Sequence, residues 1–284
     1  MLYQKFNSQH EIDEQYNPML GKDAASILAG VAKKSDDTCD VLGEPETLAF
    51  GPTLDEHLEV FKAAESKARL HIFIHGGYWR ACSSKEFALV ARQLVPAGVT
   101  TLIVNYSLCP KVSMSEIVRQ VRSAVAWAWH NADRLGIDRN RISISGHSAG
   151  GHLVGMLLVT DWEGDYGLPR DVIKGALAVS GLFDLRPFPH SWLQPVLQLS
   201  ERDIQDLSPI NLEANYPIPV KIRVGALESE EFHRQSKVYA SHLSSKGFDV
   251  EYASVPNVDH YSVLDHYYKA DGILLKDILD MSSI

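Results

Sequence analysis

The sequence predicts a single α/β domain over residues 1–284, in which a mostly parallel central sheet has helices on both faces. Short apolar runs alternate with longer amphipathic segments, which is the pattern of strand–helix–strand units on a parallel sheet. The runs are apolar enough to be central strands covered on both faces. The chain is also 45% hydrophobic and 22% charged, which is a globular composition. Its length fits one core with an elaboration.

The expected strands are spread from the first third of the chain to its C-terminal part. They cover residues 71–76, 100–107, 142–148, 175–181, 220–226 and 250–255. Upstream, residues 47–53 and 56–62 indicate an antiparallel start to the sheet. Residues 1–40 are expected to form polar helices and loops.

Amphipathic segments between and after these strands predict helices over residues 114–136, 230–247 and 269–281. The first segment places its apolar residues on one face, namely Ile117, Val121, Ala124, Val125 and Ala128. Gly136 and Gly247 end the first two segments, as expected for helix C-caps.

Residues 182–219 break the alternation of strands and helices. Proline at this density resists long regular elements. The six prolines are Pro187, Pro189, Pro195, Pro209, Pro217 and Pro219. Apolar residues of the same segment need a surface to bury against. We therefore expect this insertion, together with the N-terminal segment 1–45, to form a cap over a site.

The charge and cysteine content exclude several classes of protein. A net charge of −9 gives no basic footprint for nucleic acid or for an anionic membrane surface. No apolar stretch has the form of a targeting signal or the length of a membrane span. Cys39, Cys82 and Cys109 fit neither a disulfide framework nor a zinc pair. The expected protein is cytoplasmic, has reduced thiols, and binds neither nucleic acid nor membrane.

A G-x-S-x-G motif at residues 146–150 provides a candidate nucleophile. The motif lies between an expected strand and the helix-compatible segment 151–159, so a sharp turn would present the Ser148 hydroxyl above the sheet. The amide of Ala149 then points to the same space. A passive serine in a glycine-rich turn is the plain alternative, and a phosphate loop lacks its required spacing. The flanking histidines, His147 and His152, are expected to orient local backbone.

A serine hydroxyl needs a base, which is expected downstream of it in the chain. His260 lies in a loop beyond the last expected strand and is the favoured base. His233, His242 and His266 fall in helical patterns, where a solvated surface histidine is the common outcome.

The orienting acid is expected after the strand at 220–226. Glu228 is nearest to that strand end, whereas Glu230 and Glu231 suit the first turn of a helix. Asp259 adjoins the histidine and is a weaker candidate. Asp184 remains a real alternative, because some hydrolases take the acid from the preceding strand.

These motifs together resemble the arylformamidase, or kynurenine formamidase, branch of the α/β-hydrolases, close to the hormone-sensitive-lipase-like esterases. The resemblance is carried by QYNP at 15–18, FGP at 50–52, HGGYW at 75–79, GHSAGGHL at 146–153 and EFHRQS at 231–236. It implies an α/β-hydrolase fold with Ser148, Glu228 and His260 as the triad. Glu228 stands where the family commonly has aspartate. The metal-dependent enzymes that share the activity use a His/Asp arrangement with no equivalent here.

Two glycines and several aromatic residues complete the expected site. The amides of Gly77 and Ala149, with that of Gly76, are expected to hold the oxyanion of an attacked carbonyl. An aromatic wall beside a small acyl pocket suits N-formylkynurenine, the substrate that the resemblance implies. Its candidates are Tyr78, Trp79, Phe183, Phe188 and Trp192.

The resulting hypothesis is a serine hydrolase that cleaves the formyl amide of N-formylkynurenine through a seryl-acyl intermediate. The alternative is a carboxylesterase of the same fold that acts on short-chain acyl or aryl esters. A catalytically inactive receptor is disfavoured, because both the serine and the histidine are present. The partner is a small aromatic amide or ester, no metal or organic cofactor is expected, and a homodimer is left open.

Overall fold

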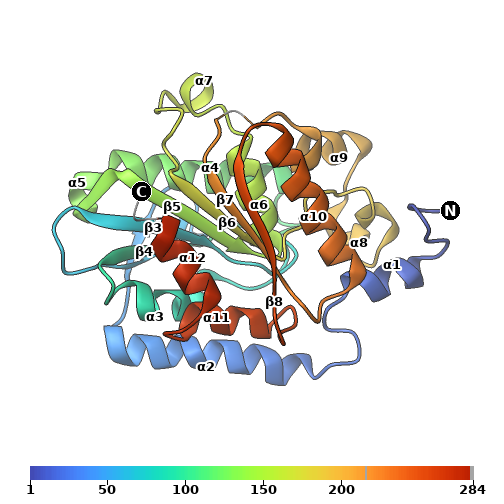
Figure 1. The fold of residues 1–284 in the computed structure, drawn as a ribbon, viewed down its shortest axis with the longest axis horizontal. Coiled ribbons are helices and arrows are strands. Elements are labelled where there is room, and N and C mark those ends of the chain that lie inside the picture. Colours follow the sequence, from blue (N-terminus) through green and yellow to red (C-terminus); the bar gives the residue numbers. More distant parts are fainter. Residues whose placement is uncertain (215, 282–284) are drawn as a thin grey trace.

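A computed structural model describes residues 1–214 and 216–281 of the chain. Within these residues eight strands form one sheet with the order β1-β2-β4-β3-β5-β6-β7-β8 (Figure 1). The strands are β1 Glu46–Ala49, β2 His57–Phe61, β3 Ala68–Ile74, β4 Val99–Val104, β5 Ile137–His147, β6 Gly175–Val179, β7 Pro219–Gly225 and β8 Asp249–Val255. The pairs β1–β2 and β2–β4 are antiparallel, and the other neighbours are parallel. The mostly parallel sheet with an antiparallel start is therefore confirmed.

Helices follow the strands and also fill the N-terminal segment and the insertion. The α-helices are α1 Gln9–Tyr16, α2 Ala24–Leu42, α3 Ala91–Leu94, α4 Met114–His130, α5 Ala132–Leu135, α6 Ala149–Leu158, α7 Trp162–Tyr166, α8 Gln194–Leu197, α9 Glu201–Leu207, α10 Glu230–Ser245, α11 Asp265–Tyr268 and α12 Ile273–Met281. Short 3₁₀ helices are η1 Ser84–Val90, η2 Phe188–His190, η3 Pro209–Asn211 and η4 Ser262–Leu264. The helix expected over 114–136 is divided at Asn131 into α4 and α5. It ends as expected at Gly136, whose φ of 68° is left-handed.

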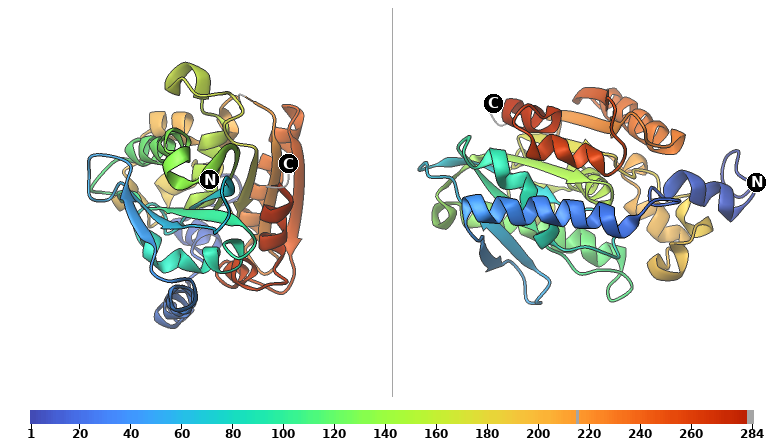
Figure 2. Two further views of the ribbon diagram at one scale, coloured as in Figure 1. Left: turned by 90° about the vertical axis from the view of Figure 1, so that its left-hand side faces the viewer. Right: turned by 90° about the horizontal axis from the view of Figure 1, so that it is seen from below.

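Side chains alternate between two apolar layers along each central strand, since successive strand residues point to opposite faces. On β3, Leu70, Ile72 and Ile74 join the layer that contains α4, α6 and α10. Phe73 between them joins the other layer, with η1, α3, α11 and α12. Both faces are thus covered, which explains why the central strands are almost uniformly apolar (Figure 2).

The N-terminal helix α2 lies across the outside of the second layer, below α3 and α11 in Figure 1. Asp23 caps its first turn by accepting from the Ser26 amide. Ser35 joins the helix to η1, because its hydroxyl donates to the Glu86 carbonyl at 2.6 Å and accepts from the Leu89 amide at 3.2 Å. This helix is therefore fixed beside the segment that follows HGGYWR, residues 75–80.

The proline-rich insertion 182–219 contains only short helices, as its composition predicts. It packs against α6, where a Cβ on Gly155 would lie 2.8 Å from Cγ of Pro209. One residue of this insertion, 215, and residues 282–284 of the expected single domain lie outside the described residues. Among the described helices none is long and apolar enough to cross a membrane.

Candidate active site

Ser148 forms a sharp turn between β5 and α6, with φ 57° and ψ −117°. Its amide donates to the Val179 carbonyl at 2.8 Å, which anchors the turn to β6. The flanking glycines are required by space, because a Cβ on Gly146 would lie 2.3 Å from the Gly150 carbonyl oxygen. A Cβ on Gly150 would lie 2.0 Å from the Ile74 carbonyl oxygen. The sequence motif thus folds into the strained strand-to-helix turn that it predicts.

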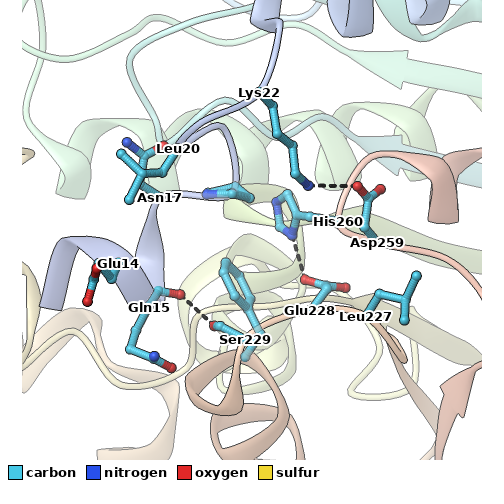
Figure 3. Close-up of a pocket in the computed structure, with 12 residues that line it drawn as sticks. Glu14, Gln15, Asn17, Leu20, Lys22, Leu227, Glu228, Ser229, Asp259 and His260 are labelled. Carbon is cyan, nitrogen blue, oxygen red and sulfur yellow. Dashed lines mark hydrogen bonds and ion pairs between the residues drawn. The ribbon is translucent and has the colours of Figure 1, made fainter. Parts of the chain in front are cut away.

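His260 and Glu228 form a buried hydrogen-bonded pair at the same edge of the sheet. Glu228 follows β7 and His260 follows β8, and Nδ1 of His260 lies 2.6 Å from Oε2 of Glu228 (Figure 3). The other carboxylate oxygen, Oε1, accepts from the Gly225 amide at 2.6 Å and from the Ser180 hydroxyl at 2.5 Å. Oε2 is therefore the oxygen that faces the imidazole. A proton on Nδ1 leaves Nε2 of His260 as an acceptor.

The competing acids are engaged elsewhere. Asp184 pairs with Arg186 and accepts from the Tyr3 hydroxyl. The other three candidates form ion pairs with basic side chains: Glu230 with Lys5, Glu231 with Arg234, and Asp259 with Lys22. Glu228 is the candidate acid that contacts His260. The position predicted from the strand end is therefore the one that the fold brings to the histidine.

His147, which precedes the elbow serine, holds the candidate base in place. Its Nε2 lies 2.8 Å from the His260 carbonyl oxygen. Burial lowers the pKa of His147 well below its usual value, so the ring is neutral and Nε2–H is the donor. The expectation that the elbow histidines orient backbone is confirmed, since His152 likewise contacts the Leu207 carbonyl at 2.7 Å.

The glycine pair after β3 runs directly beside the elbow serine. A Cβ on Gly76 would lie 3.1 Å from Cβ of Ser148 and 2.9 Å from the His147 carbonyl oxygen. Gly77 has φ 109°, and a Cβ there would lie 2.1 Å from the Ala81 carbonyl oxygen. Both positions therefore require glycine.

His75 has a positioning role that the sequence did not reveal. Its Nδ1 lies 2.7 Å from the Gly76 carbonyl oxygen, and burial lowers its pKa to about 4, so the neutral ring donates Nδ1–H. Tyr106 stacks on this ring at 4.2 Å and donates its hydroxyl to the His75 carbonyl. A planar peptide points its N–H opposite to its C=O. Holding the Gly76 carbonyl therefore also fixes the direction of the Gly77 amide.

A cavity of about 350 Å³ contains Ser148 and His260. Its wall includes Gly76, Gly77 and Tyr78, and Ala149 lies buried directly after the serine. The remaining lining residues are Met19, Ala24, Leu28, Val31, Arg80, Ala81, Cys82, Glu86, Phe87, His147, Tyr261 and Leu264. Helix α2 of the N-terminal segment thus supplies an apolar side of the cavity. The described residues of the insertion 182–219 do not line it.

A second nucleophile type, the Cys82 thiol, also lies on this wall. Burial raises the pKa of Cys82 to about 11, so the thiol is protonated at neutral pH. The Cys82 side chain is therefore a neutral thiol on this wall rather than a thiolate. Among the described residues, no group of three histidine, cysteine or acidic side chains could hold a metal ion.

The structure places most of the expected aromatic wall away from this cavity. Trp79 is fully buried, and its Nε1–H donates to Nδ1 of His152 at 3.2 Å. Phe183 stacks on Tyr239 with ring centroids 4.0 Å apart, and Phe188 is buried against Trp79. These three side chains do not line the cavity, so the expected contact with substrate is corrected. The turn at residues 77–79 directs Trp79 into the core, and the insertion buries Phe183 and Phe188 there.

Tyr78 and Trp192 lie at the border between the cavity and the insertion. Tyr78 lines the cavity, and its hydroxyl donates to the Tyr16 carbonyl at the end of α1. Trp192 packs edge-on against the Tyr78 ring with centroids 5.5 Å apart, and it does not line the cavity. Tyr78 thus joins the glycine loop to the N-terminal segment, while Trp192 supports it from behind.

An elbow serine beside a histidine–carboxylate pair, at the carboxyl edge of a mostly parallel sheet, defines the class of protein: an α/β-hydrolase. Solved structures agree with this class. A candidate thioesterase from Silicibacter sp. matches with a TM-score of 0.83 and 25% identity over 95% of this chain and 99% of that one. An esterase from Pyrobaculum calidifontis matches with a TM-score of 0.74 and 18% identity over 94% and 96%.

Sequence comparison defines the family within this class. The BD-FAE family model matches residues 58–174. A kynurenine formamidase from Salmo salar is 30% identical over 96% of both chains. One from Danio rerio is 29% identical over 98% of this chain and 97% of that one. The chain belongs to the kynurenine formamidase family and is a hydrolase.

Proposed function

We propose that the protein is an arylformamidase that hydrolyses the formyl amide of N-formylkynurenine, with Ser148, His260 and Glu228 as its catalytic triad. One observation carries the proposal: the 2.6 Å bond between His260 and Glu228 lies at the cavity that contains the elbow serine. The full-length similarity to kynurenine formamidases supports the choice of substrate.

The first step uses the tautomer that Glu228 favours. Nε2 of His260 accepts the hydroxyl proton as Ser148 Oγ attacks the formyl carbon, and the carbonyl electron pair moves onto oxygen. The amides of Gly77 and Ala149, with that of Gly76, donate to this oxyanion. Losing one such donor typically costs about 100- to 1,000-fold in rate.

The second step returns the proton to the leaving group. His260 protonates the aryl nitrogen as the carbon–nitrogen bond breaks, which releases the aromatic amine and leaves a formyl ester on Ser148. Water then gives a proton to His260 and attacks the ester carbon. His260 passes this proton to Ser148 Oγ as the carbon–oxygen bond breaks, which restores the serine and releases formic acid, which ionises to formate. Each half of the reaction uses the same oxyanion donors and needs no group beyond these residues.

The cavity suits an aromatic leaving group, although the wall differs from the expected one. Leu28 and Val31 of α2, with Phe87 and Leu264, offer apolar contacts to a ring held beside Ser148. These contacts replace the wall expected from Trp79 and the insertion. The same apolar cavity favours aryl esters as the second candidate substrate class, because it does not itself distinguish an ester from a formamide.

The proposal is tested by comparing kcat/KM of the purified protein for N-formylkynurenine and for p-nitrophenyl acetate. We expect the formamide to be the better substrate, and Ser148→Ala to remove turnover of both while the far-UV circular dichroism and Tm stay unchanged. Hydrolysis of several esters without hydrolysis of N-formylkynurenine identifies a carboxylesterase instead. Near-normal activity of the alanine variant would end the triad assignment.

A further inference from the structure

Arg80, the last residue of HGGYWR, lines the cavity that contains Ser148 and is an exposed residue. Within residues 1–214 and 216–281, no hydrogen bond or ion pair engages its guanidinium. By contrast, Arg119, Arg223 and Arg234 each hold carboxylates. An unpaired guanidinium on an exposed surface is ordinary. On the wall of a cavity lined mainly by apolar side chains it is a ready binding group for an anion.

The backbone of Arg80 is held firmly relative to the glycine pair. The amides of Arg80 and Ala81 both donate to the Gly77 carbonyl at 3.0 Å. The preceding residue, Trp79, is fully buried, and its carbonyl accepts from the Cys109 amide at 2.8 Å. The backbone of Arg80 is therefore fixed next to the glycine loop that adjoins Ser148. The position of the guanidinium then depends only on the side-chain torsions of Arg80.

Glu86 provides the opposite charge on the same wall. Its Oε2 accepts from the Ser83 amide at 2.9 Å and from the Ser83 hydroxyl at 2.6 Å, which fixes the carboxylate at the start of η1. Arg80 and Glu86 form no ion pair with each other within the described residues. Apart from histidines, they are the charged residues among those that line this cavity.

We propose that Arg80 binds the carboxylate, and Glu86 the ammonium group, of an α-amino acid attached to the aryl ring of the substrate. This inference rests on the proposed function and deepens it, because it assigns the two side chains that would recognise the amino-acid part of the substrate. A planar guanidinium matches a carboxylate with two parallel hydrogen bonds. Neutral aryl esters and simple formanilides offer nothing to either charge, so the pair selects against them.

Three substrates separate the two contacts. N-formylkynurenine carries both charges, its deamino analogue 4-(2-formamidophenyl)-4-oxobutanoate carries only the carboxylate, and ortho-formamidoacetophenone keeps the ring, ketone and formamide without either charge. The specificity ratio is kcat/KM for a charged substrate divided by kcat/KM for the neutral one. We expect Arg80→Gln to lower this ratio about tenfold for both carboxylate substrates, which corresponds to about 1.4 kcal/mol. Arg80→Lys should recover part of it, since lysine keeps the charge but lacks the fork.

Lys85 provides the matched control. It is an exposed cation five positions from Arg80, and it lines a different cavity beside Asp36 and Glu44. Lys85→Gln removes the same charge, so it reports any general attraction of the protein for anions. We expect its specificity ratio to equal that of the wild type. An equal fall in Lys85→Gln and Arg80→Gln overturns the proposed contact.

Glu86 is tested by Glu86→Gln, which can keep the capping interaction with Ser83 because glutamine also serves in a capping box. We expect a fall in kcat/KM for N-formylkynurenine relative to its deamino analogue. If Glu86→Gln leaves the ratio of kcat/KM for N-formylkynurenine to that for its deamino analogue unchanged, the ammonium contact is overturned.

The possible failures are distinguishable. If the wild type cleaves none of the three formamides, the proposed function fails and the inference falls with it. If the wild type cleaves both N-formylkynurenine and the neutral formamide, and Arg80→Gln changes them equally or not at all, only the inference fails.

Discussion

Replacing Glu228 with glutamine tests whether the carboxylate sets the proton on His260. In the structure Oε1 of Glu228 accepts from two donors, the Gly225 amide and the Ser180 hydroxyl. A glutamine oxygen fits this position, whereas an NH₂ group there would face the Gly225 N–H. The side-chain amide must then face His260. It donates to Nδ1, so the imidazole proton moves to Nε2.

The expected loss of activity in Glu228→Gln follows from the change of the His260 tautomer. With a proton on Nε2, His260 offers Ser148 a donor instead of the acceptor that must take the hydroxyl proton. An equivalent carboxylate-to-amide change in serine proteases lowers kcat by about 10⁴-fold with the geometry intact. At about 1.4 kcal/mol for each factor of ten, this corresponds to about 5.5 kcal/mol of transition-state stabilisation. The two donors on Oε1 remain satisfied, so we expect little change in the free energy of unfolding.

The assay measures kcat for N-formylkynurenine, or for p-nitrophenyl acetate, at pH 7.5 alongside urea unfolding of the same preparations. Glu228→Asp serves as the control, because it keeps the charge at a shorter reach and should lose far less activity than the glutamine variant. A fall in kcat of less than about tenfold in Glu228→Gln, with the fold preserved, would refute the tautomer argument.

Other predictions concern stability. Gly150→Ala should lower the free energy of unfolding by about 3 kcal/mol or prevent folding, because its Cβ meets the Ile74 carbonyl oxygen at 2.0 Å. Gly30→Ala, in the middle of α2 with open space at its Cβ, should instead gain about 0.5–1 kcal/mol; urea unfolding decides both. Burial lowers the pKa of His71 to about 3, so below pH 6.5 the unfolded chain binds a proton that the folded one does not. The free energy of unfolding should therefore decrease as the pH is lowered from about 6.5 to about 3. His71→Gln should reduce that slope by about 1.4 kcal/mol per pH unit, and an unchanged slope in urea midpoints would contradict the assignment.

Much of the fold and part of the site could be predicted because their causes are local. Apolar runs of strand length predicted where the parallel strands lie along the chain, and small residues around Ser148 predicted the turn that the structure contains. Glu228 and His260 could be chosen because the ends of parallel strands meet at one edge of the sheet. Their 2.6 Å bond agrees with that choice.

The aromatic residues show where local reasoning ends. Trp79 and Phe188 are aromatic, as a wall beside an aromatic substrate requires. The sequence does not show on which side of a turn an aromatic ring will lie. The left-handed residues 77–79 send the Trp79 indole into the core, where His152 satisfies its N–H. Likewise, the proline content of 182–219 does not reveal what that segment covers, and α2 supplies the cavity wall instead.

The sequence by itself determined the class of fold, the elbow serine and the residues able to serve as its partners. These features follow from strand periodicity, from the steric requirement for glycine and from the order of the elements along the chain, which can all be recognised from residues close together in the sequence. The tertiary structure alone decided which side chains enclose the cavity, and that His75 and His147 hold the glycine loop and the candidate base. It also placed Arg80 on the cavity wall with no partner among residues 1–214 and 216–281. These features arise where segments distant in the chain pack together, so the direction of each side chain depends on neighbours that the local sequence does not specify.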